Sequence, residues 1–205
     1  DTIEAIAYLV NRADNEVSAL TKLGIGIPGS LSPRTNLVRN ANSTWLIGKP
    51  LKQDLEKILK RDVLIENDAN CFAISEAFDG AGSRAHTVFG VILGTGVGAG
   101  IVIGKKLHKG KNKIAGEWGH NSLPWANEGE LPGKKCYCGR TGCLETFISG
   151  PAVEREFKNL HGRNLNMESI VKESGAGNLK AEQTIRNLED RLARALAHVI
   201  NILDP

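Results

Sequence analysis

The sequence lacks the features that would place it with membrane, secreted or nucleic-acid-binding proteins. No apolar run approaches the roughly 18 residues that a membrane-spanning helix needs, and no secretory signal is present. The basic residues are scattered and the formal net charge is only +3, which argues against a dedicated nucleic-acid surface. We therefore expect a cytoplasmic protein that has neither a membrane nor a nucleic acid as its partner.

Cysteine is also scarce, and most of it is gathered in one place. Of the four cysteines, Cys136, Cys138 and Cys143 lie within eight residues, while Cys71 stands apart. Secreted disulfide domains are usually shorter and richer in cysteine, so this cluster indicates metal ligands in a reducing compartment. Zinc prefers four tetrahedral thiolate and imidazole ligands, and the nearest upstream histidine is His120. The pattern favours a structural Cys3His zinc site, with a disulfide or a group of free thiols as the alternatives.

The rest of the chain is typical of an α/β protein. Helical spacing covers residues 2–20, 51–59, 71–78 and 179–203, and short apolar strands are predicted at residues 23–27, 62–65, 87–93 and 101–103. Strands that alternate with helices suggest a partly parallel sheet. A small, polar stretch at residues 80–86 predicts a boundary between lobes of residues 1–85 and 86–205.

Glycines are concentrated in one turn, at residues 94–100. The turn fits the dinucleotide-binding pattern G-x-G-x-x-G/A, but that fingerprint continues into a helix, and here residues 101–103 read as a strand. A hairpin whose backbone N–H groups and Thr95 hydroxyl face a phosphate is the better interpretation, because glycine permits positive φ and close approach, which makes an anion nest. A plain glycine-rich hairpin is the alternative.

A carboxylate follows the strand predicted at residues 62–65. Asp68 lies in the segment ENDAN at residues 66–70, and carboxylates at strand ends of α/β folds often point into clefts. Asp or Asn at this position could equally cap the next helix. The residues alone leave Asp68 as either a catalytic base or a cap.

Five segments together resemble one family. They are GIPG at residues 26–29, ENDAN at 66–70, LGTGVGAG at 93–100, GEWGH at 116–120 and CYCGRTGCLE at 136–145. In this order they resemble the ROK (repressor, open reading frame, kinase) family over nearly the whole chain. NANSTW at 40–45 and NSLPW at 121–125 are similar to its fructokinase/mannokinase branch.

The resemblance implies an actin-like (ribonuclease H-like), two-lobed α/β sugar kinase fold. Family members carry a phosphate loop before the region matching residue 1 and an adenosine-binding segment after the region matching residue 205. We therefore expect a fragment, truncated at both ends, with little kinase activity of its own.

The resemblance also implies a reaction, in which the γ-phosphoryl group of Mg²⁺-bound ATP passes to a sugar hydroxyl beside the base Asp68. The residues implied to bind the sugar are Gly29, Asn67, Asp68, Glu117, His120 and Glu145. Those implied to face the ATP phosphates are Gly94, Thr95 and Gly96, and those implied to hold structural Zn²⁺ are His120, Cys136, Cys138 and Cys143.

The expected hexose is fructose, with N-acetylglucosamine, glucose and mannose as alternatives, and a homodimer is common in such kinases. A sugar-responsive transcriptional repressor of the same family is a competing function. A dinucleotide-dependent oxidoreductase is another.

Overall fold

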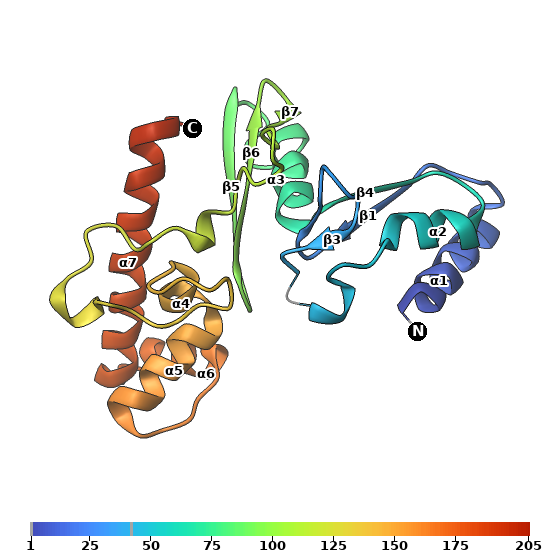
Figure 1. Cartoon of the computed structure of the whole chain (residues 1–205). Helices are drawn as coiled ribbons and strands as arrows, with labels where there is room; N and C mark the ends of the chain where they lie inside the picture. The colour runs from blue at the N-terminus through green and yellow to red at the C-terminus, as the bar shows by residue number, and fades with distance from the viewer. Residues whose placement is uncertain (1, 42) are drawn as a thin grey trace. The chain divides into compact units, whose positions relative to one another are not determined.

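The computed structural model describes residues 2–41 and 43–205, which form two compact units (Figure 1). One unit comprises Asp1–Cys71 with Lys109–Ile114, and the other comprises Phe72–His108 with Ala115–Pro205. This partition differs from the lobes of residues 1–85 and 86–205, which stay a prediction. Asn42, part of the segment at residues 40–45, lies outside the described residues.

The first unit packs two helices around a parallel strand pair. Helix α1 (Thr2–Val17) precedes strand β1 (Leu23–Ile27), and helix α2 (Leu51–Leu59) precedes strand β4 (Val63–Asn67). Strands β1 and β4 pair in parallel, as the alternation of strands and helices predicted. A second, antiparallel pair is β2 (Ser30–Leu31) with β3 (Val38–Arg39), and a 3-10 turn follows at Thr44–Leu46. The buried core includes Ile27, Leu31, Val38, Leu51, Leu55 and Val63.

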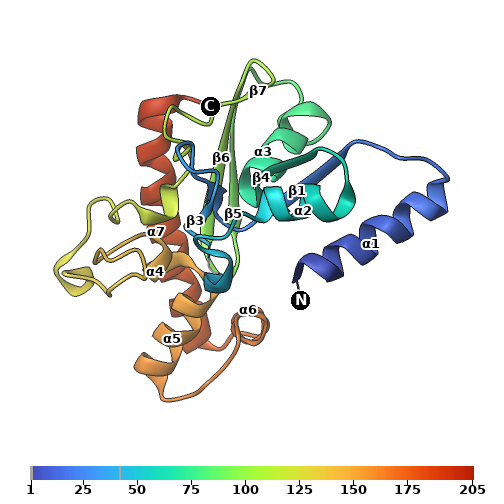
Figure 2. The ribbon, with the colours of Figure 1, turned by 45° about the vertical axis from the view of Figure 1, so that its right-hand side comes forward.

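The second unit is built on an antiparallel sheet of three strands, β5 (Thr87–Leu93), β6 (Val97–Ile103) and β7 (Lys106–Leu107). The long helix α7 (Leu179–Leu203) covers one face of this sheet, and the second half of helix α3 (Asp68–Phe78) covers the other (Figures 1 and 2). Successive strand side chains point to opposite faces, which separates the two sets of contacts. Val97 and Ala99 pack in the cluster that includes α7 residues, whereas Val102 packs with Ala73 and Ala77 of α3.

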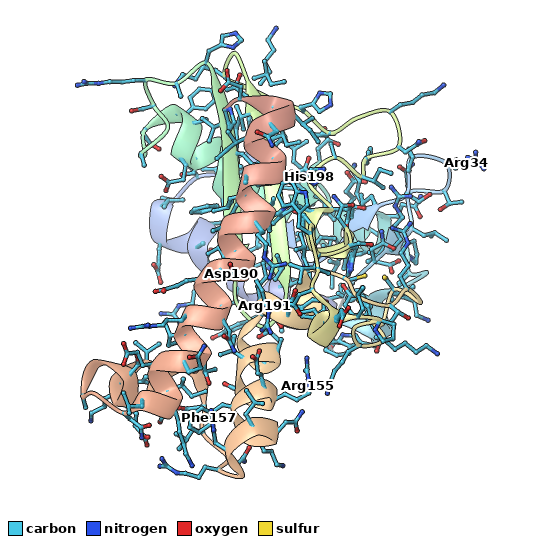
Figure 3. The ribbon with its side chains drawn as sticks, turned by 90° about the vertical axis from the view of Figure 1, so that its left-hand side faces the viewer. Arg34, Arg155, Phe157, Asp190, Arg191 and His198 are labelled. Carbon is cyan, nitrogen blue, oxygen red and sulfur yellow. The ribbon has the colours of Figure 1, made fainter. Side chains whose placement is uncertain are left out.

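Three shorter helices complete this unit: α4 (Glu145–Ile148), α5 (Gly150–His161) and α6 (Met167–Gly175). Phe157 is fully buried where α5, α6 and α7 meet (Figure 3). Single polar side chains cap the last three helices: Ser149, Asn166 and Asn178 accept backbone N–H groups at the starts of α5, α6 and α7. The long segment between β7 and α4 holds only the 3-10 turns η2 (Trp118–His120) and η3 (Glu128–Glu130).

Membrane spanning receives no support from the helices. Within the described residues, none of them combines the length and the apolar character needed to cross a bilayer.

Candidate sugar and zinc sites

Asp68 is the first residue of α3, directly after β4. The preceding Asn67 performs the cap, because its Oδ1 accepts the N–H of Asn70 at 3.1 Å. Asp68 Oδ1 accepts two hydrogen bonds, one from the N–H of Ala69 at 2.9 Å and one from Nδ2 of Asn67 at 3.0 Å. The residue is exposed, and its Oδ2 accepts no hydrogen bond from any described residue. One carboxylate oxygen is therefore held in place and the other is open.

Gly29 joins this group through the same asparagine. Asn67 Nδ2 also donates to the Gly29 carbonyl at 3.0 Å. Gly29 has φ +75°, and an added Cβ would overlap the carbonyl oxygen of Arg39, so a larger residue does not fit. The structure thus brings together Gly29, Asn67 and Asp68, the three predicted sugar-binding residues of the first unit.

Glu66 is a polar residue of this group to which the sequence analysis gave no role. Its carboxylate accepts the N–H of Asn67 at 2.9 Å and Nδ2 of Asn70 at 3.0 Å, and it forms an ion pair with Lys109. Burial raises the pKa of Glu66, but these contacts outweigh it and the pKa lies below its ordinary value. An ionised Glu66 therefore orients the two asparagines that flank Asp68.

In the second unit, residues 116–120 lie directly on strand β6. Gly116 has φ +90°, and an added Cβ would overlap the Ala99 carbonyl; at Gly119 it would overlap the Val97 carbonyl. Both glycines are required for this close approach. The segment ends in η2, which presents His120 and places Glu117 just before it.

The turn between β5 and β6 is a hairpin, as predicted, although β6 begins at Val97 rather than at residue 101. A strand follows the turn, so the helix that a dinucleotide fingerprint requires is absent from this described segment. The phosphate-binding role of this turn stays a prediction, although Gly94 and Gly96 lack the positive φ that was expected of an anion nest. A Gly94 N–H to Gly96 carbonyl bond of 3.0 Å closes the turn. Gly94 and Thr95 are nevertheless exposed.

Glu145 connects this turn to the rest of the site. Its Oε2 accepts the N–H of Val97 at 2.9 Å. An added Cβ on Gly96 would lie 2.8 Å from the same oxygen, so glycine is what lets the carboxylate approach. The Gly150 N–H donates to the Gly94 carbonyl at 2.9 Å and ties the turn to the start of α5. The predicted phosphate-facing turn and the predicted sugar residue Glu145 are therefore in contact.

The four predicted zinc ligands come together. One ligand atom from each of His120, Cys136, Cys138 and Cys143 lies within 4.8 Å of all the others. The Sγ atoms of Cys138 and Cys143 are 3.6 Å apart, and Cys136 Sγ is 3.5 Å from His120 Nδ1. Tetrahedral zinc with Zn–S near 2.3 Å and Zn–N near 2.0 Å separates two sulfurs by about 3.8 Å and sulfur from nitrogen by about 3.5 Å. These thiols are free rather than disulfide-bonded, and their spacing fits zinc.

The pKa values of the thiols in this cluster shift in different directions. Burial raises the pKa of Cys143 to about 12 and also raises the pKa of Cys136. Burial opposes the shift at Cys138, but a backbone hydrogen bond at Arg140 and its thiol neighbours lower the pKa of Cys138. Zinc is bound by thiolates, so zinc binding here must release protons.

Tyr137 is a second residue that the sequence analysis missed. It stands between two of the cysteines, and its hydroxyl lies 3.0 Å from His120 Nε2, with the two rings edge to face. Glu117 Oε2 lies 4.0 Å from the same nitrogen. Burial of the hydroxyl raises the pKa of Tyr137, and the charges of Glu145 and Glu117 raise it further. His120 therefore has its Nδ1 toward Cys136 and its Nε2 toward Tyr137 and Glu117, and the charge of Glu145 acts on the Tyr137 hydroxyl.

A buried ion-pair cluster holds the segment that leads into the zinc ligands. Glu130 is 7% exposed, and its carboxylate accepts bonds of 2.8 Å from both Arg191 and Arg194 of α7. Arg191 also pairs with Glu156 of α5. Burial raises the pKa of Glu130, but the two arginines outweigh it and lower the pKa to about 2. Figure 3 labels Arg191 on α7, beside Asp190, which pairs with Arg194.

An open cavity of about 610 Å³ adjoins this cluster. Glu130, Lys134, Arg155 and Arg191 are among the residues that line it, and none of the predicted site residues is. The predicted residues instead form two groups, one in each unit. The first is Gly29, Asn67 and Asp68; the second is Gly94, Thr95, Gly96, Glu117, His120, Cys136, Cys138, Cys143 and Glu145.

Comparison with known proteins adds independent evidence. The whole of residues 1–205 matches the ROK family. The chain belongs to the ROK family. An N-acetyl-D-glucosamine kinase of Pectobacterium carotovorum subsp. carotovorum (strain PC1) is 38% identical over 209 residues, covering 100% of this chain and 69% of the relative.

Two solved structures of ROK proteins are similar to the chain. A ROK hexokinase from Thermus thermophilus has a TM-score of 0.84 at 30% identity, covering 99% of this chain and 66% of its own. A ROK glucokinase from Streptomyces griseus, in complex with glucose and AMPPNP, has a TM-score of 0.82 at 29% identity. The match covers 99% of this chain and 68% of the glucokinase chain. The ROK chain thus spans about two thirds of the length of its sugar kinase homologues. The resemblance drawn from the five segments is confirmed, and so is the actin-like α/β fold.

Proposed function

We propose that this ROK protein is an ATP-dependent hexose kinase whose catalytic base is Asp68. The observation that carries the proposal is the geometry of this carboxylate: Oδ1 is fixed by Asn67 and the Ala69 N–H, while Oδ2 is open on an exposed residue. A base held in one orientation before substrate arrives lowers the cost of reaching the reactive geometry. The sugar kinases among the relatives support the kinase part of this proposal.

The reaction is a single phosphoryl transfer. The sugar hydroxyl oxygen forms a bond to the γ-phosphorus of ATP while the bond to the ADP oxygen breaks. Asp68 Oδ2 accepts the proton that this hydroxyl loses. ATP enters as its Mg²⁺ complex, and the Gly94-Thr95-Gly96 turn, which is exposed at Gly94 and Thr95, would contact its phosphates through the Thr95 hydroxyl and backbone N–H groups.

The residues proposed to bind the sugar offer complementary hydrogen-bonding groups. Carboxylates such as Glu117 and Glu145 accept hydrogen bonds from sugar hydroxyls, and imidazole Nε2 of His120 can donate one. The Asn67 amide offers both a donor and an acceptor. A polyol needs several such polar groups, which distinguishes this set of residues from those that bind an apolar ligand.

Zinc would be held by His120, Cys136, Cys138 and Cys143, and its role would be structural, because four protein ligands leave no open position. Binding His120 through Nδ1 leaves the proton on Nε2, so the imidazole would face the sugar as a donor. The metal would also cross-link residues 116–120 to residues 136–143, two segments with little regular secondary structure.

The proposed substrate is N-acetyl-D-glucosamine. The segments at residues 40–45 and 121–125 predict fructose, and the comparisons do not support that prediction. The Pectobacterium relative is an N-acetyl-D-glucosamine kinase, which was one of the alternatives from the sequence. Glucose is the second choice, since the Streptomyces structure contains it. Small changes around a shared polar pocket discriminate between such sugars.

A coupled assay that follows ADP formation by the full-length protein tests the proposal. N-acetylglucosamine, glucose, mannose and fructose are compared by their kcat/KM values, with Asp68→Asn as the control. We expect the highest kcat/KM for N-acetylglucosamine and loss of turnover with every sugar in Asp68→Asn. Folded protein that phosphorylates none of the four sugars would contradict the kinase assignment and favour the sugar-responsive repressor of the same family.

A further inference from the structure

The Tyr137 hydroxyl lies among the polar side chains of the second unit that are proposed to bind the sugar. Its hydroxyl lies 3.0 Å from His120 Nε2, and the ring centroids are 5.1 Å apart at 86°. His120 Nδ1 is turned toward Cys136, at 3.5 Å, so Nε2 is the nitrogen left for any other partner. Glu117 and Glu145 act electrostatically on the same hydroxyl.

A phenol hydroxyl and a sugar hydroxyl have the same hydrogen-bonding capacity, since each donates one hydrogen bond and accepts others. One imidazole N–H cannot bond strongly to both at once. A sugar hydroxyl that approaches His120 Nε2 must therefore displace the hydroxyl of Tyr137.

Such a displacement is sterically inexpensive. The Tyr137 residue is 64% exposed, although its hydroxyl is turned inward, so the ring can rotate outward without leaving a cavity in the core. Trp118, two residues before His120, is 4% exposed and packs edge to face on Phe89, so it has no such freedom.

We propose that the Tyr137 hydroxyl is a stand-in for a sugar hydroxyl, which holds His120 Nε2 in the sugar-free protein and swings out when a hexose binds. This inference rests on the proposed function, because it takes Glu117, His120 and Glu145 as sugar-binding residues. Tyr137 is a positioning residue in this scheme. It keeps the imidazole oriented with its proton on Nε2 until the substrate replaces it.

The scheme predicts that removing the hydroxyl strengthens sugar binding. In Tyr137→Phe no hydrogen bond has to be broken, and a bond of this kind contributes enough to lower the Kd by about 3- to 10-fold. Isothermal titration calorimetry with N-acetylglucosamine measures this in the absence of ATP. Zinc content should not change, and Tyr8→Phe, on α1, should leave the Kd unchanged. Weaker or equal binding by Tyr137→Phe overturns the proposal, and weaker binding would make the hydroxyl a direct sugar ligand.

Fluorine NMR tests the movement itself. The sequence has two tyrosines, so protein labelled with 3-fluorotyrosine gives two resonances, which Tyr8→Phe assigns. Saturating N-acetylglucosamine should shift the Tyr137 resonance and leave the Tyr8 resonance in place. A Tyr137 resonance unchanged in sugar-bound protein overturns the proposal. Wild-type protein that binds no hexose at all would instead contradict the proposed function, and the inference would fall with it.

Discussion

The two groups of predicted site residues are held in place by different means. Asp68 is positioned by a strand-to-helix junction, in which the neighbouring Asn67 and Ala69 supply the hydrogen bonds. The Glu117 and His120 group depends on long-range features, namely glycines packed on β6, clustered cysteines and the buried Glu130 ion pairs. A change at Asp68 should therefore affect chemistry alone, whereas changes at the second group should affect binding and stability together.

The largest expected effect is on turnover, at the first group. Asp68→Asn keeps an oxygen that can accept the Ala69 N–H, but it cannot take the proton of a sugar hydroxyl. We expect kcat to fall by about 10³-fold, in the range typical of a lost general base, with the melting temperature nearly unchanged. Steady-state kinetics and thermal unfolding of the full-length protein measure both.

Asp79→Asn is the matched control, because this exposed aspartate lies just beyond the other end of α3. It should leave both quantities unchanged. Near-normal kcat in Asp68→Asn would remove Asp68 from the mechanism, and a large drop in melting temperature would show that its main role is structural.

The next effect is on stability, in the second unit. Glu130→Gln removes the negative charge between Arg191 and Arg194, whose side chains are only 13% and 17% exposed. Breaking a buried pair leaves its partners uncompensated, so we expect a loss of about 3 kcal/mol in the free energy of unfolding, measured with urea. Glu182→Gln removes the exposed pair with Arg186 and should change little. Equal effects of the two substitutions would contradict the role given to the cluster.

The Glu130 carboxylate should make the free energy of unfolding depend on pH in the acid range. Its pKa is lowered from 4.5 to about 2 in the folded protein, so its contribution is complete above pH 4.5 and disappears as the pH falls toward 2. Over that interval the wild type should lose about 3 kcal/mol more than Glu130→Gln does. Urea unfolding at a series of pH values measures the difference. Parallel pH profiles for the two proteins would show that Glu130 titrates normally.

The smallest effect is expected at the β5–β6 turn, where two glycines form a matched pair. In Gly96→Ala the new Cβ would lie 2.8 Å from Glu145 Oε2, so the carboxylate must move; at Gly94 nothing lies within 4 Å. Gly96→Ala should raise the KM for the sugar by about 10-fold, as expected for one displaced charged hydrogen-bonding group, and Gly94→Ala should leave it unchanged. A sugar KM that changes equally in both variants would separate Glu145 from sugar binding.

Much of the fold could be predicted because local patterns determine it. The bounds of β1, β5, α2 and α7 agree with the predicted segments. One failure has a tertiary cause. Residues 97–100 read as part of a glycine turn, yet they extend β6 because they pair with residues 90–93 of β5.

The site was predictable where one short segment supplies it. The proposed zinc ligands stand out in the sequence because three of them share one loop, and the proposed sugar-binding residues Asn67 and Asp68 stand out because they follow a strand. Tyr137 was missed because its role depends on which atom its hydroxyl reaches across the loop. Glu130 was missed because its partners lie more than 60 residues away on α7.

We propose that one zinc ion holds the sugar-binding residues of the second unit in place. Metal content and N-acetylglucosamine affinity, measured together in wild type and Cys138→Ser, test it most directly, with Cys71→Ser as the control cysteine. We expect about one zinc per chain in the wild type and in Cys71→Ser, and loss of both zinc and sugar binding in Cys138→Ser. Folded wild-type protein that binds the sugar without zinc, or Cys138→Ser that keeps its sugar affinity after losing the metal, would contradict it.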